Sequence, residues 1–129
     1  MRSQTRSSQP PKRTKRRGRS EQMKICVTVS EGSLDAEVEE EFGHSPLFIC
    51  VDPDNMTFTV HDNILEDTDI GYGIQTAENL IKLGADVVIT GFIGPHGIKK
   101  LQSKNIKVVA DEEGTVREAI ERYKRRHPK

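Results

Sequence analysis

The stretch DVVITGFIGPHG, residues 86–97, decides the fold of this chain. Its start, Val87–Ile89, is an unbroken run of β-branched residues, which is typical of a strand covered on both faces of a parallel sheet. Gly91 and Gly94 then allow sharp turns, and Pro95 suits the first position of a helix. This order predicts an α/β fold. It also predicts a ligand site, because free N–H groups and the helix dipole face outward where such a strand ends.

Three strands are expected before this stretch. Residues 23–29 alternate apolar and other side chains, which is typical of a strand. Residues 46–52 and 56–62 flank Asp52-Pro53-Asp54-Asn55, where proline suits the second position of a type I turn. These two runs therefore predict a β-hairpin.

The connection formed by residues 30–45 has no clear period, so we expect a long loop with one helical turn around residues 35–40. Loops of this length inside a compact domain are typically functional or mobile. Its acids between Asp35 and Glu41 lack the alternating oxygens and central glycine of an EF-hand. A solvated acidic loop is therefore favoured over a site for a hard cation.

Helical signals dominate the second half of the chain. Apolar residues recur at helical spacing over 74–81, and Gly84 supplies the stop. A second helix is expected from Pro95 to about Lys104, followed by a strand over 106–110. The last helix is expected to begin at a capping box formed by Thr115 and Glu118. Its apolar stripe should face inward and consists of Val116, Ala119, Ile120 and Tyr123.

The expected order is strand–strand–strand–helix–strand–helix–strand–helix. A meander of three strands is antiparallel, and each later helix crosses over to a parallel strand. The economical solution is one mixed five-stranded sheet with helices on both faces, in which strands 23–29 and 86–90 lie centrally side by side. Their carboxyl ends would open a crevice lined by residues 30–32, residues 91–97 and a long loop.

Catalytic chemistry finds little support in the residues. Cys26 and Cys50 fall within predicted strands, which is typical of small buried hydrophobes and not of a disulfide framework or a reactive thiol. A P-loop sequence is lacking, and Gly71-Tyr72-Gly73 matches only half of a dinucleotide fingerprint. The central strands carry no carboxylate pair for a two-metal nuclease. We therefore expect no enzyme. His44 and His96, each in a loop that reaches the crevice, remain as candidate metal ligands.

The charge of the chain is divided between two regions. Residues 1–22 hold eight basic residues and one acid, a charge of +7, while the rest holds 12 basic and 19 acidic residues, a charge of −7. The first segment should be a disordered tail and residues 23–129 a single α/β domain. The tail is interpreted as a solvated extension, with binding of nucleic acid as the alternative. No run is long enough to span a membrane, and the cysteine usage favours the cytoplasm.

Several pieces of the chain resemble the dinitrogenase iron–molybdenum cofactor biosynthesis family, which includes NifX-type accessory proteins. They lie between Met23 and about Tyr123, and the most specific are Phe42-Gly43 followed by Ser45-Pro46, Ile93-Gly94-Pro95 and Glu113-Gly114-Thr115-Val116. The resemblance implies a ribonuclease H-like three-layer α/β/α fold without nuclease activity. It also implies that the protein binds, carries or delivers a metal cluster. Relatives often carry histidine where this chain has Glu41, and many act outside nitrogen fixation.

Two functions are therefore carried forward. The first is a non-catalytic carrier of an iron–molybdenum or iron–sulfur cluster, with cluster-assembly or acceptor proteins as partners. The second is a module without metal, in which the glycine turns bind phosphate or a carboxylate of a partner protein. His44 and His96 are the predicted metal ligands. The predicted cofactor-binding residues are Ser30, Gly32, Glu41, Phe42, Gly43, His44, Gly71, Gly73, Gly91, Gly94, Pro95 and His96.

Overall fold

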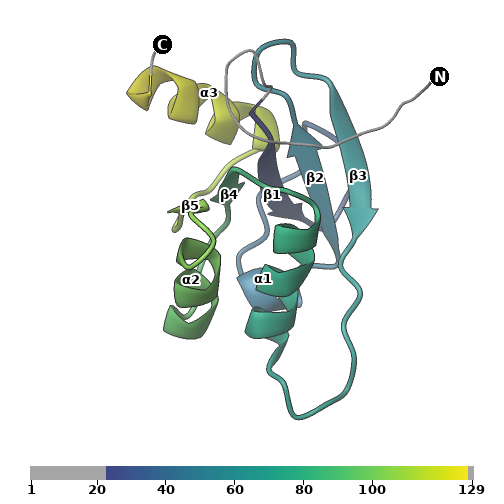
Figure 1. Ribbon diagram of the computed structural model, residues 1–129. Coiled ribbons are helices and arrows are strands. Elements are labelled where there is room, and N and C mark those ends of the chain that lie inside the picture. The colour runs from purple at the N-terminus through teal and green to yellow at the C-terminus, as the bar shows by residue number, and fades with distance from the viewer. Residues whose placement is uncertain (1–22, 128–129) are drawn as a thin grey trace, which may run out of the picture.

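The computed structural model describes residues 23–127 (Figure 1), and the predicted disordered tail, residues 1–22, lies outside them. The elements follow the predicted order, with one additional short helix of the 3-10 type, η1. In chain order they are β1 Ile25–Val29, η1 Phe42–His44, β2 Leu47–Val51, β3 Phe58–Asp62, α1 Tyr72–Lys82, β4 Val87–Ile89, α2 Pro95–Gln102, β5 Lys107–Val109 and α3 Val116–Arg126.

The five strands form one mixed sheet in the order β3-β2-β1-β4-β5. β1 pairs antiparallel with β2 and parallel with β4, and β2 and β3 form the predicted hairpin. The prediction that the first strand and the strand of residues 86–90 lie side by side in the centre is confirmed. Burial explains this arrangement, because all side chains of β1 and β4 are buried and suit strands covered on both faces.

Helices cover both faces of the sheet, which confirms the three-layer α/β/α architecture (Figure 1). The predicted stripe of α3 packs against one face of the sheet, where it contacts a core that includes Ile25, Val27 and Ile89 of the strands. α1 and α2 lie side by side on the other face, where Leu80 and Leu101 pack around Phe48 and Val88 among others. We call these the α3 face and the α1/α2 face.

The helix ends follow their local signals. Thr115 and Glu118 form the predicted capping box at the start of α3, since each side chain accepts a backbone N–H of the other residue. The chain leaves α1 through Gly84, whose φ of +77° lies in the left-handed region that favours glycine. These ends confirm the predicted stops and starts.

Residues 30–45, here named the crossing loop, pass from the α3 face to the α1/α2 face around the carboxyl end of the sheet. Leu34 and Val38 belong to the core on the α3 face, whereas Phe42 belongs to the core on the α1/α2 face. Backbone N–H groups of Val38 and Glu39 donate to carbonyls of the α3 lead-in and of β1, at 2.9 and 2.8 Å. The predicted helical turn at residues 35–40 is therefore wrong, because these groups bind other segments; a helical turn occurs instead at η1.

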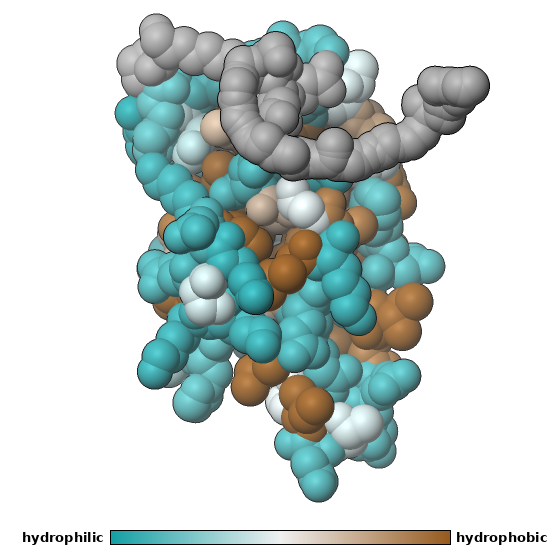
Figure 2. Space-filling model, viewed as in Figure 1, coloured by the Kyte–Doolittle hydropathy of each residue, from teal (hydrophilic) through white to brown (hydrophobic). Residues whose placement is uncertain are grey.

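Figure 2 shows the surface from the same side, with hydrophobic patches separated by hydrophilic side chains. No helix of residues 23–127 is long and apolar enough to cross a membrane.

Candidate functional site

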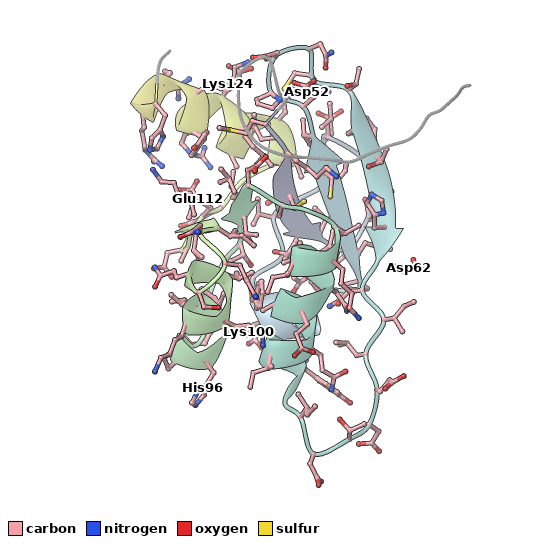
Figure 3. All side chains as sticks on the ribbon, viewed as in Figure 1. Asp52, Asp62, His96, Lys100, Glu112 and Lys124 are labelled. Atoms are coloured by element: carbon pink, nitrogen blue, oxygen red, sulfur yellow. The ribbon has the colours of Figure 1, made fainter. Side chains whose placement is uncertain are left out.

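A crevice of about 300 Å³ opens where η1 meets the N-terminal ends of α1 and α2. Figure 3 shows His96 at the N-terminal end of α2, projecting from the end of that helix. The crevice is lined by three groups of residues: Glu41, Phe42, Gly43 and His44 from the crossing loop; Gly71, Gly73 and Ile74 at α1; and Phe92, Gly94, His96 and Gly97 at α2.

Gly91 fixes the position of the wall that leads into α2. A Cβ atom at Gly91 would lie 2.4 Å from the carbonyl oxygen of Glu40, so only glycine lets the crossing loop pass this close. The Gly91 N–H donates to the Glu39 carbonyl (3.1 Å), and the Phe92 carbonyl accepts the Phe42 N–H (2.9 Å). The end of β4 and the crossing loop are thus joined through main-chain atoms.

Both helices begin at this crevice without a side-chain cap. Gly71 is the N-cap of α1 and Gly94 is the N-cap of α2, and a glycine has no side chain that could accept a hydrogen bond from the first turn. The first N–H groups of a helix have no partner within the helix, and the helix dipole places partial positive charge there. The crevice therefore offers two sets of donors to an anion.

The opposite wall is η1, which packs closely on both helices. A Cβ at Gly43 would lie 3.2 Å from the Gly73 nitrogen, so this glycine brings η1 against the start of α1. Phe42 is buried with only 2% of its surface exposed. Its ring packs against α2 at Gly97, where a Cβ atom would lie 3.3 Å from Cε2 of Phe42. Close packing at two glycines therefore shapes the floor of the crevice.

Two imidazoles face the crevice from opposite walls. His44 is exposed, its ring lies edge-on to Tyr72 with 6.4 Å between the centroids, and its Nε2 atom lies 3.5 Å from Oε1 of Glu41. His96 is the second residue of α2 and is also exposed. Within residues 23–127 no three His, Cys, Asp or Glu side chains are grouped so as to hold a metal ion.

Side-chain amides fix the segment that enters α1. The Gln75 amide donates to the carbonyls of Glu66 (2.9 Å) and Ile70 (2.7 Å), which ties down the acidic loop before this helix. The buried Asn63 amide donates to the Ser45 carbonyl (2.8 Å) and to the Thr76 hydroxyl (2.9 Å). The two hydrogen bonds of Asn63 thus connect the end of the crossing loop to α1.

Most of the predicted cofactor-binding residues come together in the structure. Eight of them line the crevice, Gly91 is buried against the crossing loop, and Pro95 is exposed at the first turn of α2; the eight are Glu41, Phe42, Gly43, His44, Gly71, Gly73, Gly94 and His96.

Ser30 and Gly32 do not line this crevice, contrary to expectation. The Ser30 hydroxyl donates to the Glu39 carboxylate (2.5 Å) and lines a different, acidic hollow. A Cβ at Gly32 would meet the Val60 side chain of β3 at 3.0 Å. The physical reason is that this part of the crossing loop still runs along the α3 face, and it reaches the other face only near Phe42.

Three lining residues, Ile74, Phe92 and Gly97, are absent from the predicted cofactor-binding residues. Phe92 and Gly97 fall within the predicted crevice wall of residues 91–97, whereas Ile74 was not predicted to line the crevice. Phe92 has 64% of its surface exposed, which is unusual for so large an apolar side chain next to a buried strand. The position of Phe92 between two turn glycines, Gly91 and Gly94, could have indicated from the sequence that this side chain lies at the crevice. The hydrogen bonds of the Gln75 amide could not be predicted from the sequence, because their partners are backbone carbonyls of an irregular loop.

Comparisons with known proteins agree with this fold. The family model described as "Dinitrogenase iron-molybdenum cofactor" matches residues 23–126. The apo form of the orange protein from Desulfovibrio gigas is 37% identical with a TM-score of 0.74, and the match covers 80% of this chain and 88% of that one. No curated protein sequence matches the chain.

Two further solved structures are similar in fold. The protein PH0822 is 22% identical, with a TM-score of 0.67 and coverage of 78% of this chain and 89% of that one. The Thermotoga protein TM1290 is 24% identical, with a TM-score of 0.66 and coverage of 80% and 88%. The family model spans β1 to α3 and hence every wall of the crevice. The chain therefore belongs to the dinitrogenase iron–molybdenum cofactor family.

Proposed function

We propose that this protein binds and carries a preformed anionic metal cluster, of the iron–molybdenum-cofactor or iron–sulfur type, in the crevice between η1, α1 and α2. The observation that carries the proposal is the convergence of two uncapped helix N-termini and two exposed imidazoles on one opening. In this role the cluster is cargo and is not a resident cofactor.

The donor set suits a cluster better than a bare metal ion. A structural zinc site takes four protein ligands, and hard cations take six or more oxygens. His44 and His96 supply two nitrogen atoms at most to one metal. A cluster brings its own sulfide ligands and negative charge, so it needs only one or two protein ligands together with N–H donors around it.

The central strands support binding and delivery over hydrolysis. The buried polar side chains of this part of the sheet, Thr28 in β1 and Thr90 after β4, hydrogen-bond to each other at 2.7 Å. β1 and β4 bring no carboxylate to this position, where a nuclease would place its metal ligands. We therefore propose a protein without catalytic turnover.

The similar proteins support a cluster as cargo. The family is described by a cofactor, and the orange protein was solved in an apo form, a term for a protein without its bound group. Cluster-assembly or acceptor proteins would then be the partners, in nitrogen fixation or outside it. The cytoplasmic location stays a prediction from the cysteine usage.

Reconstitution tests the proposal. The full chain is incubated with tetrathiomolybdate or with ferrous ion and sulfide, and bound metal and the visible charge-transfer band are measured after gel filtration. We expect His44→Ala and His96→Ala each to weaken uptake roughly tenfold, the size of effect seen when groups around a metal are removed. His61→Ala is the matched control, because His61 lies on β3, outside the lining of the crevice, and binds Thr59.

Uptake that is unchanged in both histidine variants, or equally reduced by the control, would exclude the crevice as the cluster site. A second outcome would favour the module without metal, which the uncapped N-termini also suit. In that case phosphate would shift the amide resonances of residues 91–98, and none of the metal species would.

A further inference from the structure

The two cysteines of the chain form a facing pair in the centre of the sheet. Cys26 on β1 is directly opposite Cys50 on β2 in the antiparallel register. Both thiols are free, both side chains lie on the α1/α2 face, and their Sγ atoms are 2.7 Å apart. Neither residue lines the proposed cluster crevice, so this pair needs its own explanation.

The backbone geometry suits a disulfide. Opposed residues of antiparallel strands have Cα atoms about 4.5 to 5.5 Å apart, within the range of about 4.4 to 6.8 Å found in disulfides. The two sulfurs would approach by only about 0.7 Å to reach the bond length of about 2.05 Å. A tetrahedral metal with bonds of about 2.3 Å would instead push them apart to roughly 3.8 Å. The geometry therefore favours a sulfur–sulfur bond over a shared metal ion.

Both cysteines are buried, as the sequence predicts, but Cys50 is the less enclosed of the two. Cys50 lines a surface hollow of about 240 Å³ whose other walls include Lys24, Thr57, Phe58 and Thr59. Cys50 is 5% exposed, whereas Cys26 is fully buried. The hydrogen bond with Cys26, aided by the ammonium of Lys24, lowers the pKa of the Cys50 thiol against the opposing effect of burial, while the same hydrogen bond and burial raise the pKa of Cys26. Because Cys50 lines the hollow and Cys26 does not, Cys50 is the attacking thiol and Cys26 the resolving thiol.

We propose that Cys26 and Cys50 form a reversible redox site that exchanges with a low-molecular-weight disulfide such as glutathione disulfide. The Cys50 thiolate attacks one sulfur of glutathione disulfide, the sulfur–sulfur bond breaks, and one glutathione thiolate leaves. Cys26 then loses its proton to water and attacks the Cys50 sulfur, which forms the Cys26–Cys50 bond and releases the second glutathione. The two protein thiols are oxidised by two electrons, and glutathione disulfide is reduced to two glutathione molecules.

The position of the bond links the redox state to the crossing loop. A Cys26–Cys50 disulfide closes the segment between β1 and β2, which contains the whole crossing loop and η1. Cross-links of this kind restrict the unfolded chain, so the oxidised protein should resist unfolding more than the reduced protein. This inference is independent of the cluster proposed above.

The experiment equilibrates the full-length protein anaerobically in glutathione buffers, traps free thiols by alkylation and measures intact mass. Both thiols of the wild-type protein should disappear together, with a loss of about 2 Da. The oxidised fraction should follow the ratio of squared glutathione to glutathione disulfide concentration. Cys26→Ala should stop at one glutathione adduct on Cys50, and Cys50→Ala should react roughly tenfold more slowly, because Cys26 is buried.

Three results would overturn the inference. The first is a wild-type protein that keeps both thiols in oxidising buffer while its circular dichroism stays native. The second is a disulfide that forms only in urea, where the chain is unfolded. The third is equal reaction rates for the two alanine variants. The wild-type measurement decides the matter even where an alanine variant fails to fold.

Discussion

The two walls of the crevice are built in opposite ways. The α2 wall is local, since a buried strand, a turn and a helix follow one another within residues 87–102. The η1 wall is the end of an irregular loop that is held by backbone bonds to β1, to the end of β4 and to the lead-in of α3. The conformation of the α2 wall is determined by its own residue types, whereas that of the η1 wall is determined by its contacts with distant segments. The two walls should therefore respond differently to substitution.

The sharpest contrast is between two phenylalanines, one on each wall. Phe42 is 2% exposed and Phe92 is 64% exposed. We expect Phe42→Ala to lower the free energy of unfolding by about 3 kcal/mol, because it leaves a cavity beside α2. Phe92→Ala should change it by less than about 0.5 kcal/mol. Urea denaturation measures both, and similar losses for the two variants would refute the comparison.

A glycine pair tests the point where the loop crosses. In Gly91→Ala the new methyl group meets the Glu40 carbonyl, so we expect a loss of about 2 kcal/mol as the crossing loop is displaced. Gly73→Ala is the control, since a Cβ there meets nothing within 4 Å and alanine favours a helix. Thermal and urea unfolding should show a loss for the first and none for the second. A neutral Gly91→Ala would mean that the crossing is not fixed here.

The far anchor of the crossing loop is the capped start of α3. Thr115→Ala removes the hydroxyl that accepts the Glu118 N–H at 3.1 Å, and it should lower the free energy of unfolding by about 1 kcal/mol. Thr115→Ser keeps a capping hydroxyl and should stay close to the wild-type protein. Equal losses in the two variants would show that the methyl group, not the cap, matters at this position.

The smallest effect is expected at the ion pair between the loop and α3. Arg117 Nε lies 3.2 Å from Asp35 Oδ1, and both side chains are half exposed or more. Asp35→Asn should therefore cost about 0.3 kcal/mol at low salt. The cost should vanish in 1 M salt, where charges are screened within about 3 Å. A double-mutant cycle with Arg117→Gln isolates the pair, and a coupling above about 1 kcal/mol would contradict the expectation.

The same contrast explains what could be predicted from the sequence. The run Val87–Ile89 and the Thr115–Glu118 box each carry their signal within a few residues, and both elements formed where expected. The Asp52–Asn55 signal gave the hairpin, but its connection is longer than the predicted turn, because the Asp52 carbonyl accepts the N–H of Met56 (2.7 Å). The sheet order followed from these elements and from the rules of connection. Local chemistry and chain topology were enough for the fold.

The crossing loop could not be predicted in the same way. Its course depends on backbone bonds from Val38 and Glu39 to distant segments, and such bonds leave no period in the sequence. The predicted positions of Ser30 in the crevice and of a helical turn at residues 35–40 are therefore wrong. The glycines and histidines of the crevice were found because turns and imidazoles are recognisable residue by residue. Gln75 and Asn63 act on irregular backbone and were not recognisable.

The crossing at Gly91 has a consequence for engineering. The loop is fixed there through main-chain atoms of Glu39, Glu40 and Phe92, and the side chains of Glu40 and Phe92 are exposed. Residue identity can therefore change at these outward positions, and at Glu41, without altering the path of the chain. The size and charge of the crevice opening can thus be varied by substitution, while the absence of a Cβ atom at Gly91 lets the crossing loop stay against the end of β4.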